Sequence, residues 1–175
     1  RGAPVIRSPG QHYEVQTHYL PRRAEQTLEQ HLAATVRRRA GNRCEYCRLP
    51  QAAFPRPFHI EHVIARQHGG QTVASNLALA CQMCNLKKGP NLSGVDPDTG
   101  TVVRLFHPRQ DRWDEHFIPV IVMGGPGRVE IRGLTDVGRA TVNVMALNAP
   151  MRQVLRYELW QEGLYRVESG DQGWP

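Results

Sequence analysis

Four cysteines in two Cys-x-x-Cys pairs are the residues of this sequence whose spacing most directly indicates chemistry. Cys44 and Cys47 form the first pair, and Cys81 and Cys84 form the second. Two such pairs bring four thiolates within reach of one ion and predict a tetrahedral zinc site, although two disulfides or four free thiols are the alternatives. Four thiolates leave zinc no open coordination position, so the predicted role is structural.

A second group of reactive side chains lies between the cysteine pairs. The stretch FHIEHVIARQHGG, residues 58–70, places Glu61 directly before His62 at the end of a predicted strand. A buried strand disfavours an unpaired charge, so the two residues are either an exposed ion pair or part of a site. Asn85 follows the second cysteine pair in a predicted short helix, about one turn from Cys81 on the same side. This geometry would hold Asn85 near the strand end that carries Glu61 and His62.

The elements that must position these residues predict an α+β protein. Between the cysteine pairs, the order is strand, long polar loop, strand and short helix. A preceding helix is predicted by an apolar stripe at helical spacing, and it ends at a basic triplet and a glycine. The stripe consists of Leu28, Leu32, Ala33 and Val36.

The C-terminal half predicts a small β region followed by two helices. TVVRLF and VEIRGL favour strands, with the turn sequence GGPG between them. Thr135 is a candidate cap for the first helix, and Pro150 would separate it from a second helix, MRQVLRYELWQEG. The expected division of the chain is an extended arm over 1–23, a helix over 24–41, the core over 42–95, an extension over 96–165 and a tail over 166–175.

Composition indicates the kind of partner. The 175 residues carry 22 Lys and Arg against 16 Asp and Glu, which gives a net charge of +6 and favours an anionic partner such as nucleic acid. No segment approaches the roughly 18 apolar residues of a membrane span, and the first residues contain no apolar signal region. A cytoplasmic location is therefore expected, where paired cysteines more often bind metal than form disulfides.

The motifs, taken in order, resemble the HNH endonucleases. The resemblance implies a ββα-metal core, also called a His-Me finger, stapled by a four-cysteine zinc site and flanked by helices and a small β region. The flanking segments 89–117 and 133–142 resemble an extended set of bacterial HNH proteins, which carries the likeness over about residues 30 to 165. The motifs are Cys44-x-x-Cys47, Glu61-His62, Gly69-Gly70, Asn76-Leu77, Cys81-x-x-Cys84-Asn85 and Lys88.

The resemblance also implies roles for individual residues. His62 matches the general base that takes a proton from water, because an imidazole titrates near neutral pH. Glu61 and Asn85 match the ligands of one Mg²⁺ or Mn²⁺, with His59 as an additional ligand or outer partner. Asn76 matches a residue that pins the long loop and orients the histidine. Two positions depart from the commonest pattern, since Asn85 replaces a histidine and Glu61 has a longer arm than aspartate.

Basic residues near this core are candidates for phosphate contact. Lys87 and Lys88 either touch phosphate or form a solvated helix end. Arg37, Arg38 and Arg39 either neutralise the C-terminus of their helix or contact nucleic acid.

The predicted function is a metal-dependent endonuclease acting on DNA, and double-stranded DNA is the expected substrate. The alternatives are a non-catalytic nucleic-acid-binding module that needs zinc, or a subunit that is active only in a larger assembly. Protein partners and a homodimer are both compatible with the sequence. Trp113 and Trp160 favour core packing over base stacking.

Overall fold

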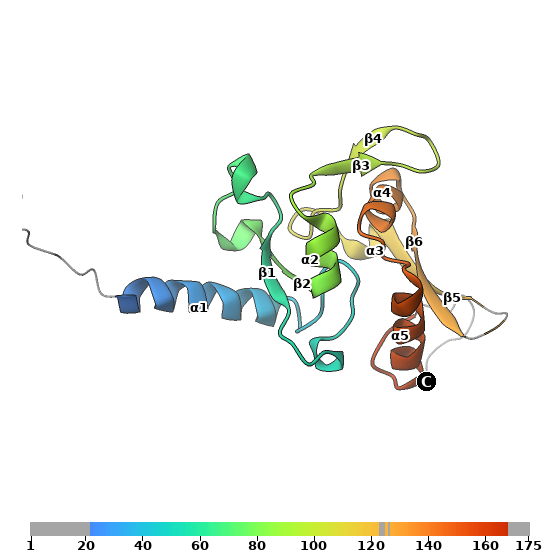
Figure 1. Ribbon diagram of the computed structural model, residues 1–175, viewed down its shortest axis with the longest axis horizontal. Helices are drawn as coiled ribbons and strands as arrows, with labels where there is room; N and C mark the ends of the chain where they lie inside the picture. The colour runs from blue at the N-terminus through green and yellow to red at the C-terminus, as the bar shows by residue number, and fades with distance from the viewer. Residues whose placement is uncertain (1–21, 123–124, 126, 168–175) are drawn as a thin grey trace, which may run out of the picture.

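The computed structural model describes residues 22–122, 125 and 127–167 (Figure 1). Most of the expected N-terminal arm over 1–23, and most of the tail over 166–175, lie outside these described residues. The described chain combines helices with three two-stranded antiparallel sheets, which confirms the predicted α+β class. None of the described helices has the length and apolarity needed to cross a membrane.

The core between the cysteine pairs is a β-hairpin followed by a short helix. Strand β1 (His59–His62) pairs antiparallel with β2 (Leu77–Ala80), so that Glu61 lies opposite Ala78. All four β2 residues are buried, as expected for the apolar sequence LALA. The chain then enters α2 (Gln82–Lys88), which packs on both strands. Short 3₁₀ turns lie before β1 and in the loop between the strands: η1 (Gln51–Ala53), η2 (Arg66–His68) and η3 (Ala74–Asn76).

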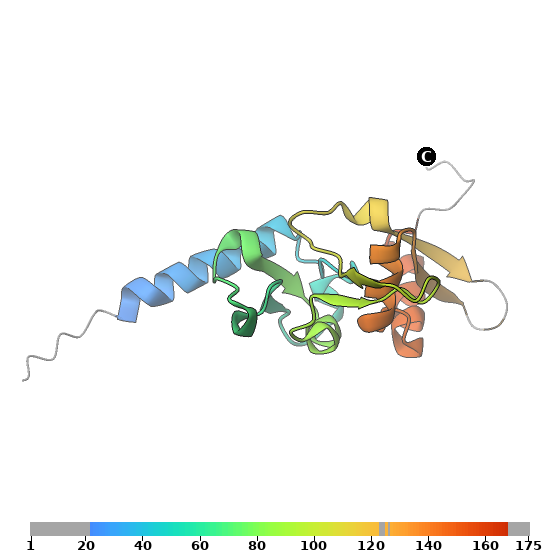
Figure 2. The same ribbon diagram turned by 90° about the horizontal axis from the view of Figure 1, so that it is seen from above.

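The long N-terminal helix joins the core only at its C-terminal end. Helix α1 (Arg22–Arg39) projects away from the rest of the molecule in both views (Figures 1 and 2). Val36 and Ala40 at its inner end are buried in the main hydrophobic core. The predicted apolar stripe therefore anchors the helix by its last turns.

Two of the three arginines at the end of α1 hold this junction together. Arg37 donates to the carbonyl of Phe58 at 2.8 Å, and Arg39 donates to two carbonyls of the η3–β2 segment at 2.8 and 2.6 Å. These contacts give Arg37 and Arg39 a structural role at the junction, and their expected contact with nucleic acid stays a prediction. Arg38 is exposed.

The C-terminal extension is a hairpin covered by two helices. Helices α4 and α5 both pack against strand β6 (Figure 1). Thr135 caps α4 by accepting a hydrogen bond from the Gly138 amide at 3.0 Å, as the sequence predicts. Pro150, expected to break the chain before the second helix, is itself the first residue of α5. The elements are β5 (Phe117–Val122), β6 (Arg128–Gly133), α4 (Asp136–Val144) and α5 (Pro150–Gln161).

Each of the two predicted strands, TVVRLF and VEIRGL, pairs with a strand that the sequence pattern did not indicate. Strand β4 (Val102–Arg104) pairs with β3 (Ser93–Val95), and β6 pairs with β5, which follows the short helix α3 (Trp113–His116). The sequence pattern missed β5 because Pro119 interrupts it. Pro119 lies opposite Ile131 in a sheet of two strands, where each strand is an edge and a missing N–H donor is tolerated.

The β3–β4 hairpin is fixed to α4 by a buried ion pair. Asp96 accepts two bonds from Arg139 at 2.8 and 2.7 Å, and a third from the Thr99 hydroxyl at 2.8 Å. The Asp96 side chain is fully buried. The bidentate contact with Arg139 holds the pKa of Asp96 well below its usual range.

Asp96 is expected to stabilise the fold in a pH-dependent way. Because its pKa is depressed in the folded state, its contribution is complete above the unfolded value of about 3.9 and is lost as the pH falls below it. Asp96→Asn should therefore lower the melting temperature most at neutral pH, and the difference should shrink below about pH 4. Melting curves between pH 2.5 and 7 measure this. Glu158→Gln is the control, since Glu158 is exposed on α5, whereas the exposed Asp98 also pairs with Arg139 at 3.0 Å; an equal effect of both variants at every pH would contradict the assignment.

Candidate functional site

The four cysteines form one buried cluster from two separate segments. Their sulfur atoms all lie within 4.8 Å of one another. Cys44 and Cys47 come from the turn after α1, whereas Cys81 caps the N-terminus of α2 and Cys84 lies in its first turn. All four thiols are free, and the Cys47 and Cys81 sulfurs are 3.8 Å apart, far beyond the disulfide bond length of about 2.05 Å. The disulfide alternative is therefore wrong.

The cluster has the dimensions of a four-thiolate zinc site. A zinc–sulfur bond of about 2.3 Å gives a tetrahedron whose sulfur–sulfur edges are about 3.8 Å. The Cys47–Cys81 separation equals that edge. The four cysteines can hold a metal ion such as zinc, which would tie the turn before β1 to the start of α2.

A buried arginine from the C-terminal extension contacts this cluster. The Arg152 guanidinium on α5 donates to the Cys84 sulfur at 2.9 Å and to the carbonyls of Met145 and Ala146 at 3.2 and 3.3 Å. Burial lowers the pKa of Arg152, but the charges of the surrounding thiolates more than offset this, so the net shift is upward. A zinc ion with four thiolates carries a net negative charge, which the guanidinium partly neutralises. Sequence reasoning missed Arg152, because nothing near it in the chain points to the cysteines.

Removing this guanidinium should weaken zinc binding. Outer-sphere partners of metal ligands typically contribute about 10- to 100-fold in metal affinity, and we expect a loss of that size for Arg152→Gln. Zinc affinity is measured by competition with a chromophoric chelator, alongside the melting temperature.

Arg156→Gln provides the matched control for Arg152→Gln. Arg156 lies one turn later on α5, is fully buried, and donates only to oxygens of Val129, Leu147 and Asn148. It should lower stability without a specific loss of zinc affinity. Equal zinc affinities for the two variants would contradict the role of Arg152.

Glu61 is part of a buried polar group, which corrects the alternative of an exposed pair with His62. Glu61 is 6% exposed; one carboxylate oxygen accepts from the Tyr46 hydroxyl, and the other lies 3.4 Å from the Lys88 ammonium. Burial raises the pKa of Glu61, while Lys88 and Tyr46 oppose that shift. Lys88 is 1% exposed and also donates to the His62 carbonyl at 3.3 Å. The expected phosphate contact of Lys88 is therefore corrected to an internal ion pair.

His62 is partly exposed and is oriented by the loop between the two strands. Its Nε2 atom lies 2.9 Å from the Thr72 hydroxyl. Burial lowers the pKa of His62, and the positive charges of Arg66 and Lys88 lower it further. These effects favour the neutral imidazole, the form that can accept a proton.

Asn76 holds the loop that carries Thr72. Its side chain is buried, accepts from the Ile64 amide at 2.9 Å, and donates to the carbonyls of Ile64 and Gln71 at 3.0 and 2.9 Å. Gly70 fits beside this bridge only because it lacks a side chain, since a Cβ atom there would lie 1.7 Å from the Ile64 carbonyl oxygen. The pinned segment places Thr72 against His62.

The remaining predicted residues surround α2. Asn85 is partly buried, and its backbone amide donates to the Cys81 carbonyl at 2.9 Å. His59 is exposed at the start of β1, where it lines a hollow with Gln82, and Lys87 is exposed. In the described part of the chain, the cysteine cluster is the one group of three or more His, Cys, Asp or Glu side chains with metal-binding spacing. Glu61 and His59 thus do not form a preassembled acidic or histidine cluster.

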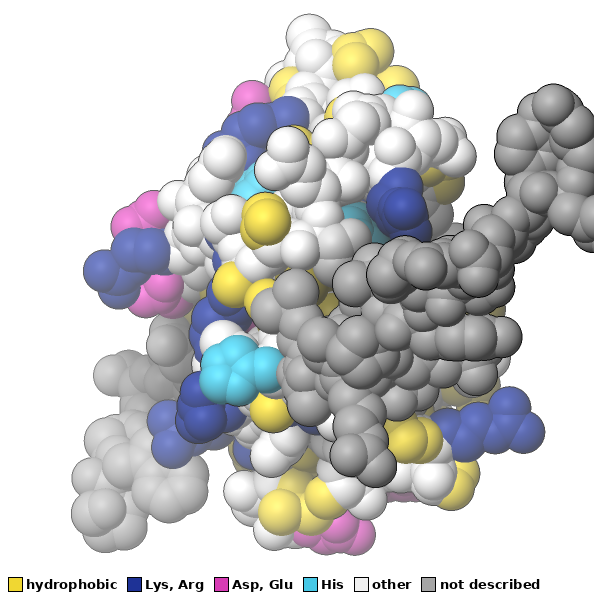
Figure 3. Space-filling model, turned by 90° about the vertical axis from the view of Figure 1, so that its left-hand side faces the viewer, with side chains coloured by type: hydrophobic (Ala, Val, Ile, Leu, Met, Phe, Trp, Pro, Cys, Tyr) yellow, Lys and Arg dark blue, Asp and Glu magenta, His cyan; other side chains and the backbone are white. Residues whose placement is uncertain are grey.

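Basic side chains gather near exposed histidines on one side of the molecule. Figure 3 shows Lys and Arg side chains beside histidines on the face from which α1 projects. Arg66, which follows β1, and Lys87 on α2 are among the exposed basic residues of the core. Such a surface is suited to a polyanion.

Comparison with known families identifies the core. Residues 44–91 match the family model described as HNH endonuclease. The chain contains an HNH domain. This domain includes all four cysteines together with Glu61, His62, Asn76 and Asn85, so the resemblance seen in the sequence is confirmed. No curated protein matches the chain, and no solved structure does.

Proposed function

We propose that the protein is a metal-dependent endonuclease that hydrolyses phosphodiester bonds in DNA, with His62 as the general base. The observation that carries this proposal is the partly exposed His62 imidazole, held by Thr72 at the end of β1 in an HNH domain. When Nε2 donates to the Thr72 hydroxyl, Nδ1 is the nitrogen that can accept a proton from an attacking water.

The neighbouring donors fit a hard divalent cation. A carboxylate and an amide oxygen, completed by water and substrate phosphate, make up the ligand set that Mg²⁺ or Mn²⁺ prefers. The Glu61 carboxylate has about four acceptor positions, and Tyr46 and Lys88 occupy only part of them. Glu61 on β1 and Asn85 on α2 would hold the ion, and the ion would supply charge neutralisation at the scissile phosphate and the leaving 3′ oxygen.

The chain's own residues keep this arrangement in place. Tyr46 and Lys88 fix the two carboxylate oxygens of Glu61 and thereby its orientation. Asn76 and Gly70 fix the loop that orients His62. Exposed basic residues, among them Lys87 and Arg38, are proposed to contact the DNA backbone.

The proposal predicts that His62 is needed for cleavage but not for folding. Loss of a general base typically reduces the rate by about 10²- to 10⁴-fold, and His62→Ala should cut plasmid DNA at least about 100-fold more slowly than the wild type in Mg²⁺ or Mn²⁺. His68→Ala is the matched control, because His68 is an exposed histidine of the same loop.

Zinc content, melting temperature and DNA affinity are measured on the same samples. All three should stay at the wild-type level in both variants, and EDTA should stop cleavage before zinc is lost. Near wild-type cleavage by folded His62→Ala would refute the assignment of the base. A wild-type protein that binds DNA but never cuts it with either ion would show a binding module or an incomplete assembly instead.

A further inference from the structure

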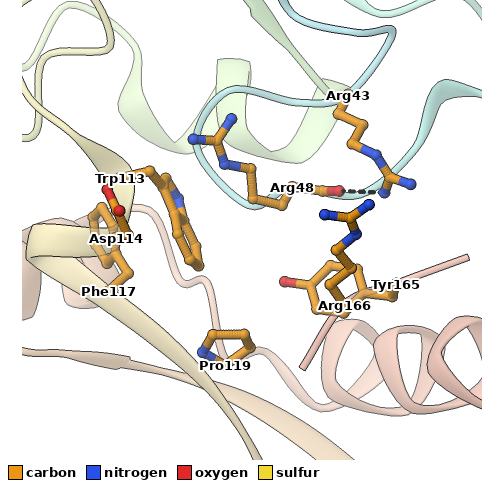
Figure 4. Close-up of a pocket in the computed structure, with 8 residues that line it drawn as sticks. All are labelled: Arg43, Arg48, Trp113, Asp114, Phe117, Pro119, Tyr165 and Arg166. Carbon is orange, nitrogen blue, oxygen red and sulfur yellow. Dashed lines mark hydrogen bonds between the residues drawn. The ribbon is translucent and has the colours of Figure 1, made fainter. Parts of the chain in front are cut away.

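A cavity on the other side of the first cysteine turn has no part in the proposed cleavage. Its volume is about 270 Å³, close to the lower end of the range for pockets that hold small organic ligands, about 300 Å³. It lies between the turn that follows Cys47, the α3–β5 segment, and the chain that follows α5 (Figure 4). Three segments that are far apart in the sequence therefore build its walls.

The polar wall of the cavity is positively charged. Arg43, Arg48 and Arg166 line it against a single carboxylate, Asp114, which already pairs with Arg112 at 3.0 Å. Arg43 also donates from one guanidinium nitrogen to the carbonyls of Arg48 and Leu164 at 3.2 and 3.0 Å, which leaves its other N–H groups for a ligand. Within residues 22–122 and 127–167, as far as the structure describes them, none of the three lining arginines forms an ion pair. An anionic group in the cavity would satisfy this excess charge.

Arg48 is the most unusual of these arginines. Its backbone has φ +61°, a left-handed conformation that favours glycine or asparagine over arginine. Its side chain is half-buried, and its guanidinium lies over the Trp113 ring at 5.2 Å from the centroid. Glycine at position 48 would relieve the backbone strain, but it would also remove a positive charge from the cavity wall.

The remaining walls are flat and rigid. The Trp113 indole N–H donates to the Tyr46 carbonyl at 2.8 Å, and the ring packs against Phe117 at 5.2 Å. Pro119 and Tyr165 complete the apolar surface, and the Tyr165 hydroxyl is held by the Cys47 carbonyl at 3.0 Å. Figure 4 shows Trp113, Pro119 and Tyr165 around one space, with the three arginines above and beside it. A flat ring that carries an anionic group matches these walls.

We propose that this cavity binds one unpaired nucleotide of a nucleic-acid strand, with its phosphate at Arg48, Arg43 and Arg166 and its base against Trp113 and Pro119. Flat apolar surface combined with arginine is the usual way in which single-stranded nucleic acid is bound. The inference rests on the proposed nuclease function, which it deepens by assigning a preference for substrates with an unpaired end or flap. A free nucleoside monophosphate offers the same chemistry, so the experiment includes it separately.

The cavity is linked to the candidate catalytic residues through Tyr46. Its carbonyl holds Trp113 at the cavity wall, and its hydroxyl donates to Glu61. A ligand seated against Trp113 would thus lie one residue away from the group that fixes the Glu61 carboxylate.

The test measures binding by the 175-residue chain carrying His62→Ala, so that the probe is not cut. Calorimetric titrations use thymidine monophosphate, a single-stranded oligothymidine and a blunt duplex. Arg48→Gly removes the guanidinium and suits the backbone, so the fold is retained and the melting temperature should not fall. Arg132→Gln is the control, because Arg132 is exposed on β6 outside the cavity and carries the same charge.

We expect Arg48→Gly to weaken binding of the oligonucleotide and the mononucleotide at least tenfold, and Arg132→Gln to change it less than twofold. The blunt duplex should not displace the mononucleotide, whereas the oligonucleotide should. Equal losses of affinity in both variants would show that only the net charge of the protein matters and would overturn the proposal. A second contradicting result is that the mononucleotide binds in an Arg48-dependent way and yet is not displaced by the oligonucleotide. That result would overturn the proposal that the bound nucleotide belongs to a nucleic-acid strand.

Failure of this inference is separable from failure of the nuclease proposal. Plasmid cleavage by the wild-type protein is measured in parallel. Cleavage without Arg48-dependent nucleotide binding would refute the cavity assignment alone. Nucleotide binding without cleavage would refute the catalytic proposal and leave the cavity as a nucleotide site.

Discussion

The convergence of four cysteine sulfurs on one buried point is the constraint on which the rest of this structure depends. The first pair follows α1 and the second begins α2, so an ion shared by the four sulfurs would fix where the hairpin starts and where its helix begins. The segment enclosed between the pairs adds its own buried apolar residues to the core, among them Leu49, Phe58 and Val63. In such small cores the binding free energy of a structural metal is also folding free energy.

The charge of that cluster explains why the C-terminal extension is part of the same fold. Four thiolates around one divalent ion leave a net negative charge in a buried place, which is unfavourable without a partner. Arg152 supplies the partner from α5, and α5 in turn packs on β6. Arg156 on the same helix fixes the carbonyls of Val129 and Leu147. The cysteine cluster, helix α5 and the β5–β6 hairpin therefore stabilise one another.

Features that depend on local chemistry could be predicted from the sequence. The cysteine cluster and the cap at Thr135 each follow from a few adjacent residues, and the structure contains both. Pro150 separates the two C-terminal helices as expected, but as the first residue of the second helix. Contacts between residues that are far apart in the chain could not be predicted from the sequence pattern. The burial of Lys88 beside Glu61 and the contact of Arg152 with Cys84 join elements that are remote in the chain. Strand β5 was missed because the proline that weakens its local signal is harmless in a two-stranded sheet.

Hydrogen exchange of the zinc-loaded and zinc-stripped protein tests whether the cysteine cluster joins α2 to α5. Removal of zinc should raise the exchange rates of the amides of both helices together, because the cluster contacts both. Readdition of zinc should restore protection in both. Loss of protection in α2 while α5 and β6 stay fully protected would contradict this prediction, since the C-terminal extension would then fold independently of the four cysteines.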